Sequence, residues 1–175
     1  STLLAREHHM RPEMTRLIGS IIAGALEAVH EAGQVYGVVR PERILLCSGE
    51  VARLNCFGVE SVTWRFPRVF LVDGWSIEDA YLYAAPETLR GGELSPQSDV
   101  YSLGASMFHM ICGLPPYPAR DVADLLARQV DEDVPSPRIY EQSVPAALAA
   151  VVKKALSREP EKRYENAHAL RSALD

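Results

Sequence analysis

Apolar residues recur at helical spacing near the start of the chain and again in its last third. Between residues 12 and 32 they fall every three or four positions, and Gly33 is suited to end the helix. The same spacing predicts shorter amphipathic helices at residues 121–130, 145–156 and 166–174, with Asn166 as a candidate N-cap. Most of the chain is therefore expected to be helical.

One further helix is expected to be buried on all sides. Residues 98–112, SDVYSLGASMFHMIC, carry a single formal charge, Asp99, and small or apolar residues on nearly every face. Gly113 supplies a stop, and the stretch is too short and too polar to span a bilayer. Asp99 would lie at the start of this helix, where free backbone N–H groups and the helix dipole favour a carboxylate. We expect the backbone of a neighbouring loop to be its partner.

Strand-like patterns are confined to a short part of the chain. After an irregular turn at residues 35–43, two strands are predicted at residues 44–47 and 51–54, joined by a hairpin turn. Between residues 55 and 85 no period persists, although residues 68–72 could pair as a strand. A loop of this length in a compact domain is usually functional or mobile. The pattern predicts one mainly α domain, residues 1–175, with a small β-hairpin.

Composition narrows the class of protein. The net charge of -5 and the pI near 5.6 argue against nucleic acid or an anionic membrane as the main partner. We find no apolar run of membrane-spanning length and predict no direct membrane insertion. The three cysteines are an odd number without metal-ligand spacing. We therefore predict reduced thiols, a cytoplasmic location (alone or as the cytoplasmic part of a larger protein), and no metal or cofactor.

Several stretches, in order along the chain, resemble protein kinases. Residues 36–45, YGVVRPERIL, resemble the catalytic loop HRDLKPENIL, and Cys56-Phe57-Gly58 stands where the family has DFG. Residues 85–87 are an intact APE, and residues 98–104 resemble the opening of the family's central helix. The resemblance is to the C-terminal lobe of bacterial serine/threonine kinases. It makes residues 56–87 the activation-segment-like loop, and the N-terminal lobe has no counterpart in this sequence.

The resemblance implies that the reacting groups are replaced. Val38 stands where the family has the loop aspartate, and an isopropyl group accepts no proton. Arg43 and Cys56 replace an asparagine and an aspartate that hold magnesium, for which a guanidinium and a soft thiol are poor ligands. Arg40 replaces the loop lysine and keeps its charge. These positions predict a catalytically inactive pseudokinase that is not an enzyme.

The structural residues of the same family are retained. The resemblance implies a buried ion pair between Glu87 and Arg163, and it implies that Asp99 holds the loop backbone at Tyr36 and Gly37. Phe57 and Gly58 of the DFG-like stretch are also present. Retained structural residues beside lost reacting groups predict a protein-interaction or regulatory scaffold.

Two apolar stretches are candidate interfaces, because an uncovered apolar face on a monomer usually marks a contact site. In the family, the strand that contains Ile44, Leu45 and Leu46 lies beneath the adenine. A second stretch mixes the aromatic side chains of Trp64, Phe66 and Phe70 with arginines, a composition enriched at interfaces, although a folded loop could bury it. We expect the first face to be covered by a protein partner, by a second copy, or by the chain's own N-terminal segment and long loop.

Some residues leave alternatives open. Arg40 and Arg43 could bind an anion or nucleotide, which would make the domain a degenerate sensor, or could pair with Glu42, Glu50 or Glu60. Tyr36, in place of the loop histidine, is expected to be a core aromatic with a satisfied hydroxyl. Cys56 is expected to be a small buried residue, with a redox or disulfide role beside Cys47 as the alternative. Unusual transferase chemistry on the same fold is a third possible function.

Overall fold

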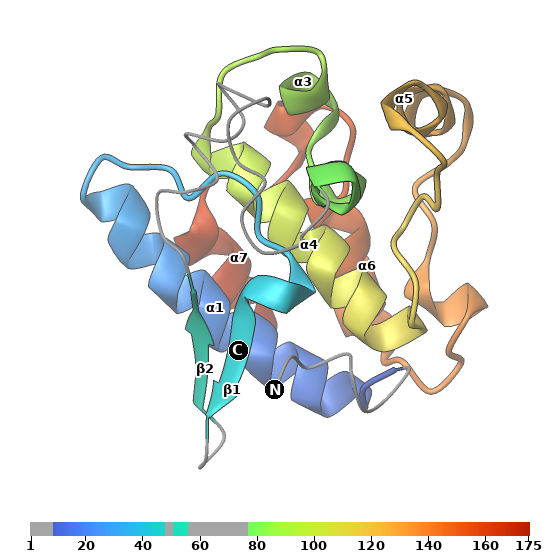
Figure 1. The fold of residues 1–175 in the computed structure, drawn as a ribbon. Helices are drawn as coiled ribbons and strands as arrows, with labels where there is room; N and C mark the ends of the chain where they lie inside the picture. The colour runs from blue at the N-terminus through green and yellow to red at the C-terminus, as the bar shows by residue number, and fades with distance from the viewer. Residues whose placement is uncertain (1–8, 48–50, 56–76) are drawn as a thin grey trace.

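The computed structural model describes residues 9–47, 51–55 and 77–175. These residues form a mainly helical domain with one antiparallel two-stranded sheet, as the sequence pattern predicts (Figure 1). The elements, in chain order, are α1 Pro12–Glu31, η2 Pro41–Arg43, β1 Ile44–Cys47, β2 Val51–Leu54, η3 Ile77–Tyr83, α3 Pro86–Leu89, α4 Pro96–Cys112, α5 Val122–Asp131, η4 Pro137–Ile139, α6 Ala146–Ala155, η5 Pro160–Lys162 and α7 Ala167–Leu174, where η marks a 3-10 helix.

Helix α4 is the central element of the domain. It packs against α1, α6 and α7, and its side chains are buried on almost every face, as predicted (Figure 1). It begins at Pro96, two residues before the predicted start, because Ser95 and Ser98 form a reciprocal capping box. Gly113 ends it with φ 75°, a left-handed conformation that glycine adopts without strain.

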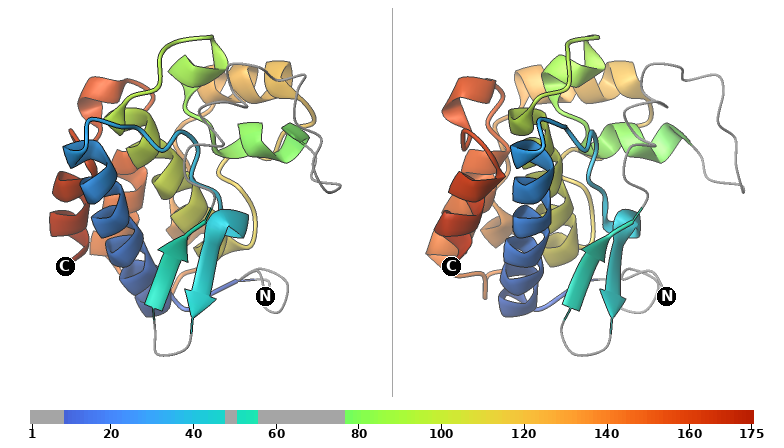
Figure 2. Two further views of the ribbon diagram at one scale, coloured as in Figure 1. Left: turned by 60° about the vertical axis from the view of Figure 1, so that its left-hand side comes forward. Right: turned by 90° about the vertical axis from the view of Figure 1, so that its left-hand side faces the viewer.

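Helix α1 forms a second layer over α4. Its N-terminal turn starts at Pro12, as predicted, and its apolar stripe buries Ile18, Ile22 and Leu26. The two views of Figure 2 place α7 and the β-hairpin on opposite sides of α1, and α1 packs against both. In this way α1 connects the hairpin to the helical core.

The hairpin has the predicted strands and an antiparallel register that pairs Ile44 with Leu54 and Cys47 with Val51. Ile44 is fully buried in the hydrophobic core, whereas Leu46 is 42% exposed. Ile44 and Leu46 are two residues apart and therefore lie on the same face of the strand, so the difference is one of position along β1. The outer end of β1 therefore turns away from the core.

The last three helices lie within one residue of the predicted bounds. Asp121 and Asn166 are N-caps whose side chains accept hydrogen bonds from Asp124 and Ala169 backbone N–H groups, which is why α5 and α7 begin one residue later than predicted. The amphipathic pattern of residues 121–130 would also bury Val122 and Val130, and this expectation is wrong, since they are 39% and 53% exposed. Helix α5 packs mainly against α3 and η3, so only part of its apolar stripe is covered.

The short elements η3 and α3 were not predicted. Segments of four and seven residues with single-turn or 3-10 geometry give no lasting period along the sequence. The predicted strand at residues 68–72 lies outside the described residues. Within the described ranges, no helix combines the length and the apolar character that crossing a membrane requires.

The close approach of α4 and α6 depends on Gly104. A Cβ atom added there would lie 2.8 Å from the Cβ of Ala155. Gly104→Ala is expected to lower the free energy of unfolding by about 1–2 kcal/mol through overpacking, measured by urea denaturation. The matched control is Gly24→Ala on α1, which meets only the half-exposed Arg171 guanidinium and should gain up to about 1 kcal/mol of helix propensity. Equal effects of the two substitutions would contradict this interpretation.

Candidate functional site

The loop that resembles the catalytic loop is fastened to α4 by Asp99. One carboxylate oxygen of Asp99, Oδ2, accepts a 2.8 Å hydrogen bond from the Tyr36 backbone N–H, and Oδ1 accepts one of 2.8 Å from Gly37. The Asp99 side chain is fully buried. Gly37 has φ 114°, a conformation that other residues rarely adopt. The structure thus brings these three residues together on the first turns of α4.

Two serines on the same face of α4 continue this attachment. The Ser102 hydroxyl accepts a 2.9 Å hydrogen bond from the Val39 N–H and donates one of 3.0 Å to the Asp99 carbonyl. The Ser106 hydroxyl donates a 3.0 Å hydrogen bond to the Val39 carbonyl. Sequence reasoning missed both serines. The signal was present: polar residues at positions i, i+3 and i+7 of an otherwise apolar helix share one face.

Residues from other elements complete the surroundings of the loop. His30, near the end of α1, places its Nε2 atom 2.9 Å from Oδ2 of Asp99. This contact was also missed, because α1 and α4 are far apart in sequence. The Tyr36 ring is fully buried and its hydroxyl donates a 2.6 Å hydrogen bond to the Asn55 carbonyl. The expectation of a core aromatic with a satisfied hydroxyl is therefore confirmed.

The positions that should carry the reaction are only partly described. Val38 is 1% exposed and Arg40 is 6% exposed, and Arg43 is half-buried at the end of η2. Val38 has a hydrocarbon side chain, so it offers neither a proton acceptor nor a metal ligand. Cys56, Phe57 and Gly58 lie outside the described residues.

The kinase resemblance implies magnesium and a nucleotide, and the described donor set does not fit the metal. Arg43 presents a cation without a lone pair where the family has an asparagine. Within the described ranges, no three His, Cys, Asp or Glu side chains are placed to hold a metal ion. These residues therefore assign no catalytic step to a metal.

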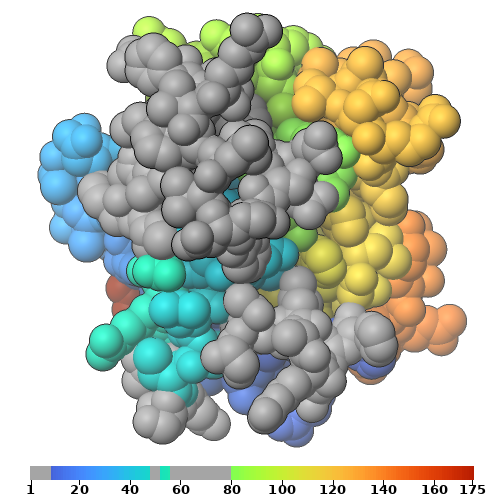
Figure 3. All heavy atoms as spheres, in the orientation of Figure 1, coloured from blue at the N-terminus to red at the C-terminus, as the bar shows by residue number. Residues whose placement is uncertain are grey.

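The predicted interface on β1 needs correction. Ile44 is fully buried as part of the hydrophobic core, so its side chain is not available to a partner. Leu45 is half-buried, and Leu46 is exposed on the hairpin, which reaches the surface in Figure 3. The other candidate residues, Trp64, Phe66 and Phe70, lie outside the described residues.

A partly buried ion pair joins α3 to the segment before α7, with the Glu87 side chain 24% exposed. Arg163 Nη1 and Nη2 donate hydrogen bonds of 2.6 and 2.7 Å to the two oxygens of Glu87. The Arg163 side chain is fully buried, and it also donates to the carbonyls of Gln97, Ser157 and Arg158. Its guanidinium lies 4.9 Å from the centre of the Tyr101 ring. Only the planar fork of arginine satisfies all these acceptors at once.

Arg163→Lys is expected to lower the free energy of unfolding by about 3 kcal/mol. A lysine ammonium keeps the charge but loses the bidentate geometry, and it leaves several buried carbonyls without a donor. Urea denaturation at neutral pH measures the change. Lys162→Arg, on the exposed neighbour, is the matched control and should change stability by less than about 0.5 kcal/mol. A loss below about 1 kcal/mol at Arg163 would contradict the expectation.

A second polar pair links η3 to α4. The Tyr83 hydroxyl oxygen lies 2.7 Å from Nδ1 of His109, and the two rings are nearly parallel with centres 5.9 Å apart. Burial lowers the pKa of His109 below its ordinary value of 6.5, opposed by the backbone of Gly113. The neutral imidazole can then accept the hydrogen bond that Tyr83 donates.

This pair makes stability depend on pH below neutrality. Because the folded-state pKa of His109 is lowered, the unfolded chain binds the proton more readily. The contribution of His109 is therefore fully present above about pH 6.5 and declines as the pH falls below that value. Comparing unfolding free energies at pH 7.5 and 5.5 tests this, and His109→Asn, which keeps an acceptor, should reduce the difference. An unchanged pH dependence in the variant would refute the assignment.

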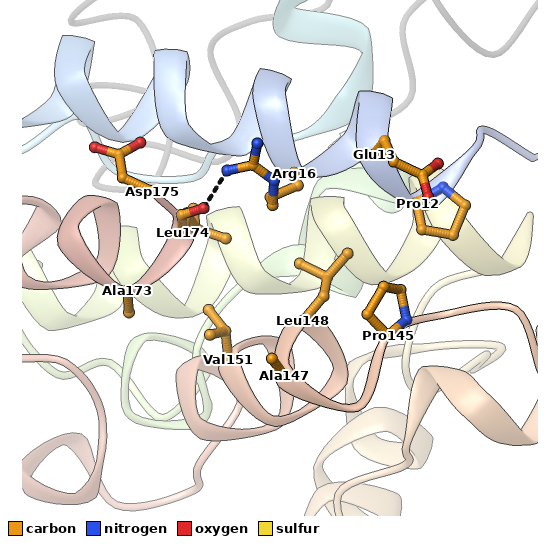
Figure 4. A pocket seen from close by; sticks show the side chains of 10 residues that line it. All are labelled: Pro12, Glu13, Arg16, Pro145, Ala147, Leu148, Val151, Ala173, Leu174 and Asp175. Atoms are coloured by element: carbon orange, nitrogen blue, oxygen red, sulfur yellow. Dashed lines mark hydrogen bonds between the residues drawn. The ribbon is translucent and has the colours of Figure 1, made fainter.

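The surface of the described chain also has a hollow of about 300 Å³ between α1, α6 and α7 (Figure 4). Leu148 and Val151 give it an apolar wall, and Arg16 donates a hydrogen bond to the Leu174 carbonyl at its edge. None of the residues 36–43 lines it. The hollow is therefore separate from the loop site.

The family model and the similar proteins found by comparison all indicate the same family. The family described as "Protein kinase domain" matches residues 1–174. Serine/threonine-protein kinase PknK of Mycobacterium tuberculosis (strain ATCC 25618 / H37Rv) is 34% identical over 163 residues, 93% of this chain and 14% of PknK. PknH of the same strain is 30% identical over 166 residues, and PknE of strain ATCC 25177 / H37Ra is 29% identical over 164 residues.

The chain belongs to the protein kinase family, and its mainly helical fold with one hairpin corresponds to the C-terminal lobe of that family. The match to PknH includes 95% of this chain, and the match to PknE includes 94%. The same matches span only 26% of the length of PknH and 28% of the length of PknE. The activities of those whole proteins are thus not activities shown for this chain.

The prediction that the chain is not an enzyme is wrong. The matched family is that of protein kinases, and PknK, PknH and PknE are all named serine/threonine-protein kinases, which points to an enzyme. The error came from extending the chemistry of single side chains, Val38 above all, to the class of the whole protein. Side chains at three or four positions report on local chemistry alone.

Proposed function

We propose that this member of the protein kinase family is a regulatory, protein-binding domain in bacterial serine/threonine kinase signalling. The proposal concerns binding. Phosphoryl transfer is a separate property, which the hydrocarbon at Val38 and the cation at Arg43 are expected to limit, since a positioned acid–base group is typically worth about 10²–10⁴-fold in rate.

One observation carries the proposal: the frame around the loop is complete, while position 38 holds a buried valine. Asp99, Ser102 and Ser106 fix the backbone from Tyr36 to Val39 with hydrogen bonds of 2.8–3.0 Å. Such a frame fixes the buried loop, and with it the position of the elements packed around it, whether or not the loop has a proton acceptor. A rigid, preorganised surface is what a protein partner needs for specific binding.

The Glu87–Arg163 pair supports the same proposal. It fixes α3, immediately after η3, against the C-terminal helices through five hydrogen bonds of Arg163. In the described part of the chain, Cys47 and Cys112 are free thiols. Free thiols persist in a reducing compartment, so the proposal includes a cytoplasmic setting.

The alternative of an anion or nucleotide sensor is not favoured by the described residues. Arg40 is only 6% exposed, and both Arg40 and Arg43 already interact with other groups of the chain. An arginine that is buried and engaged offers little to an incoming phosphate.

The test compares partner binding by two variants of the complete protein that carries this domain, one altered in the frame and one in the loop side chain. Arg163→Lys weakens the frame, whereas Val38→Ala shortens a buried loop side chain and keeps the backbone hydrogen bonds of the frame. Cross-linking in the native bacterium measures the associated partner, and transfer of radiolabelled phosphate from ATP is measured alongside. We expect Arg163→Lys to lose most of the partner and Val38→Ala to retain it within about twofold, because the frame contacts the loop through its backbone.

Gly104→Ala is the stability control, since it destabilises the core without touching Glu87 or Arg163. Retention of the partner by this variant, with loss in Arg163→Lys, supports the proposal. Loss of the partner in both, or in neither, would overturn it.

A further inference from the structure

A polar hollow of about 440 Å³ lies between the C-terminal end of α1 and the beginning of α7. Five residues line it: Glu27, His30 and Glu31 of α1, and Asn166 and His168 of the α7 N-terminus. All five carry polar side chains, and none belongs to the loop at residues 36–43. The hollow is therefore polar throughout, and its lining is different from the loop at residues 36–43.

His30 is the unusual member of this set. Its side chain is only 8% exposed, and Nε2 faces the Asp99 carboxylate at 2.9 Å. A carboxylate is an acceptor, so the nitrogen that faces it carries the hydrogen, and Nδ1 of a neutral ring is left with a lone pair. Nδ1 is buried, and no described residue donates a hydrogen bond to it. A buried acceptor of this kind needs a donor.

The carboxylates of the hollow indicate that this donor is positively charged. Glu27 is held by His168 Nδ1 at 2.6 Å and by Arg171 at 3.3 Å, and these contacts lower its pKa. Glu31 is exposed and forms no ion pair with another described residue. Both lie near the C-terminal end of α1, which carries the negative pole of the helix dipole. Arg171 thus compensates Glu27, whereas the carboxylate of Glu31 has no ion-pair partner among the described residues.

We propose that this hollow binds an arginine side chain of a protein partner. A guanidinium supplies several N–H donors in one plane, so it can pair with the exposed Glu31 and turn its remaining donors toward the polar lining of the hollow, where a small rotation of the His30 ring would present Nδ1. A metal ion is the less suitable occupant, since no three His, Cys, Asp or Glu side chains of the described chain are placed to hold one. The inference rests on the proposed function and names a surface for it.

The experiment uses the chain with the probe peptide acetyl-Gly-Arg-Gly-Arg-Gly-amide, and a second peptide in which neutral citrulline replaces both arginines. Backbone and imidazole nitrogen NMR spectra are recorded during titration. We expect shifts confined to residues 27–31 and 166–168, together with a change at the His30 ring, for the arginine peptide alone.

Glu31→Lys should weaken this binding by about tenfold or more, the loss expected for one charge-assisted pair. The substitution suits the C-terminal end of α1, so the fold should be unaffected. Glu93→Lys is the matched control, because Glu93 is exposed, undergoes the same charge change and does not line the hollow. It should bind as the original chain does.

Equal binding of the citrulline peptide, shifts outside the hollow, or unchanged affinity in Glu31→Lys would each overturn the inference. A change at the His30 ring with Zn²⁺ alone, and none with the arginine peptide, would replace it by a metal site. If the peptide fails while Arg163→Lys still loses the native partner, only this inference is lost. If Arg163→Lys keeps that partner, the proposed function itself fails.

Discussion

A single buried carboxylate, that of Asp99, holds three parts of this domain together. A charge in the protein interior is costly unless hydrogen bonds and nearby dipoles compensate for its lost hydration. Here two backbone N–H groups of the loop, the His30 ring of α1 and the first turns of α4 all provide this compensation. Because Asp99 needs all of these groups, α1, α4 and the loop at Tyr36 and Gly37 cannot separate without leaving a charge unsatisfied.

The family of this chain points to an enzyme, whereas the side chain at the centre of the loop has no acid–base group. Residues 1–174 match the protein kinase domain, and relatives such as PknK are named serine/threonine-protein kinases. Val38, however, is a buried hydrocarbon side chain at the centre of the loop. A kinase-family domain with this arrangement keeps the geometry of its loop more completely than its acid–base groups, and on that contrast we base a role in protein binding.

The sequence predicted what depends on repeating local patterns. The helices α1, α4, α6 and α7 and the β1–β2 hairpin came from periodicity and capping residues, and Asp99 stood out as the one charge in an apolar helix. The contacts of His30, Tyr83 and His109 could not be predicted, because each joins segments that only the tertiary fold brings together. The exposure of Val122 and the burial of Ile44 likewise depend on which neighbours cover an element, and no local pattern encodes that.

Four hydrogen bonds described above join α4 to main-chain atoms of the loop: the N–H groups of Tyr36, Gly37 and Val39, and the carbonyl of Val39. The helix therefore recognises the path of the loop and not the identity of its side chains, apart from the positive φ at Gly37. A loop held in this manner can exchange residues of similar size at position 38, which is buried in the core, without losing these hydrogen bonds. The same arrangement should allow a loop transplanted from another family member to be received by this helix, and it offers a simple physical route by which chemistry can diverge while architecture persists.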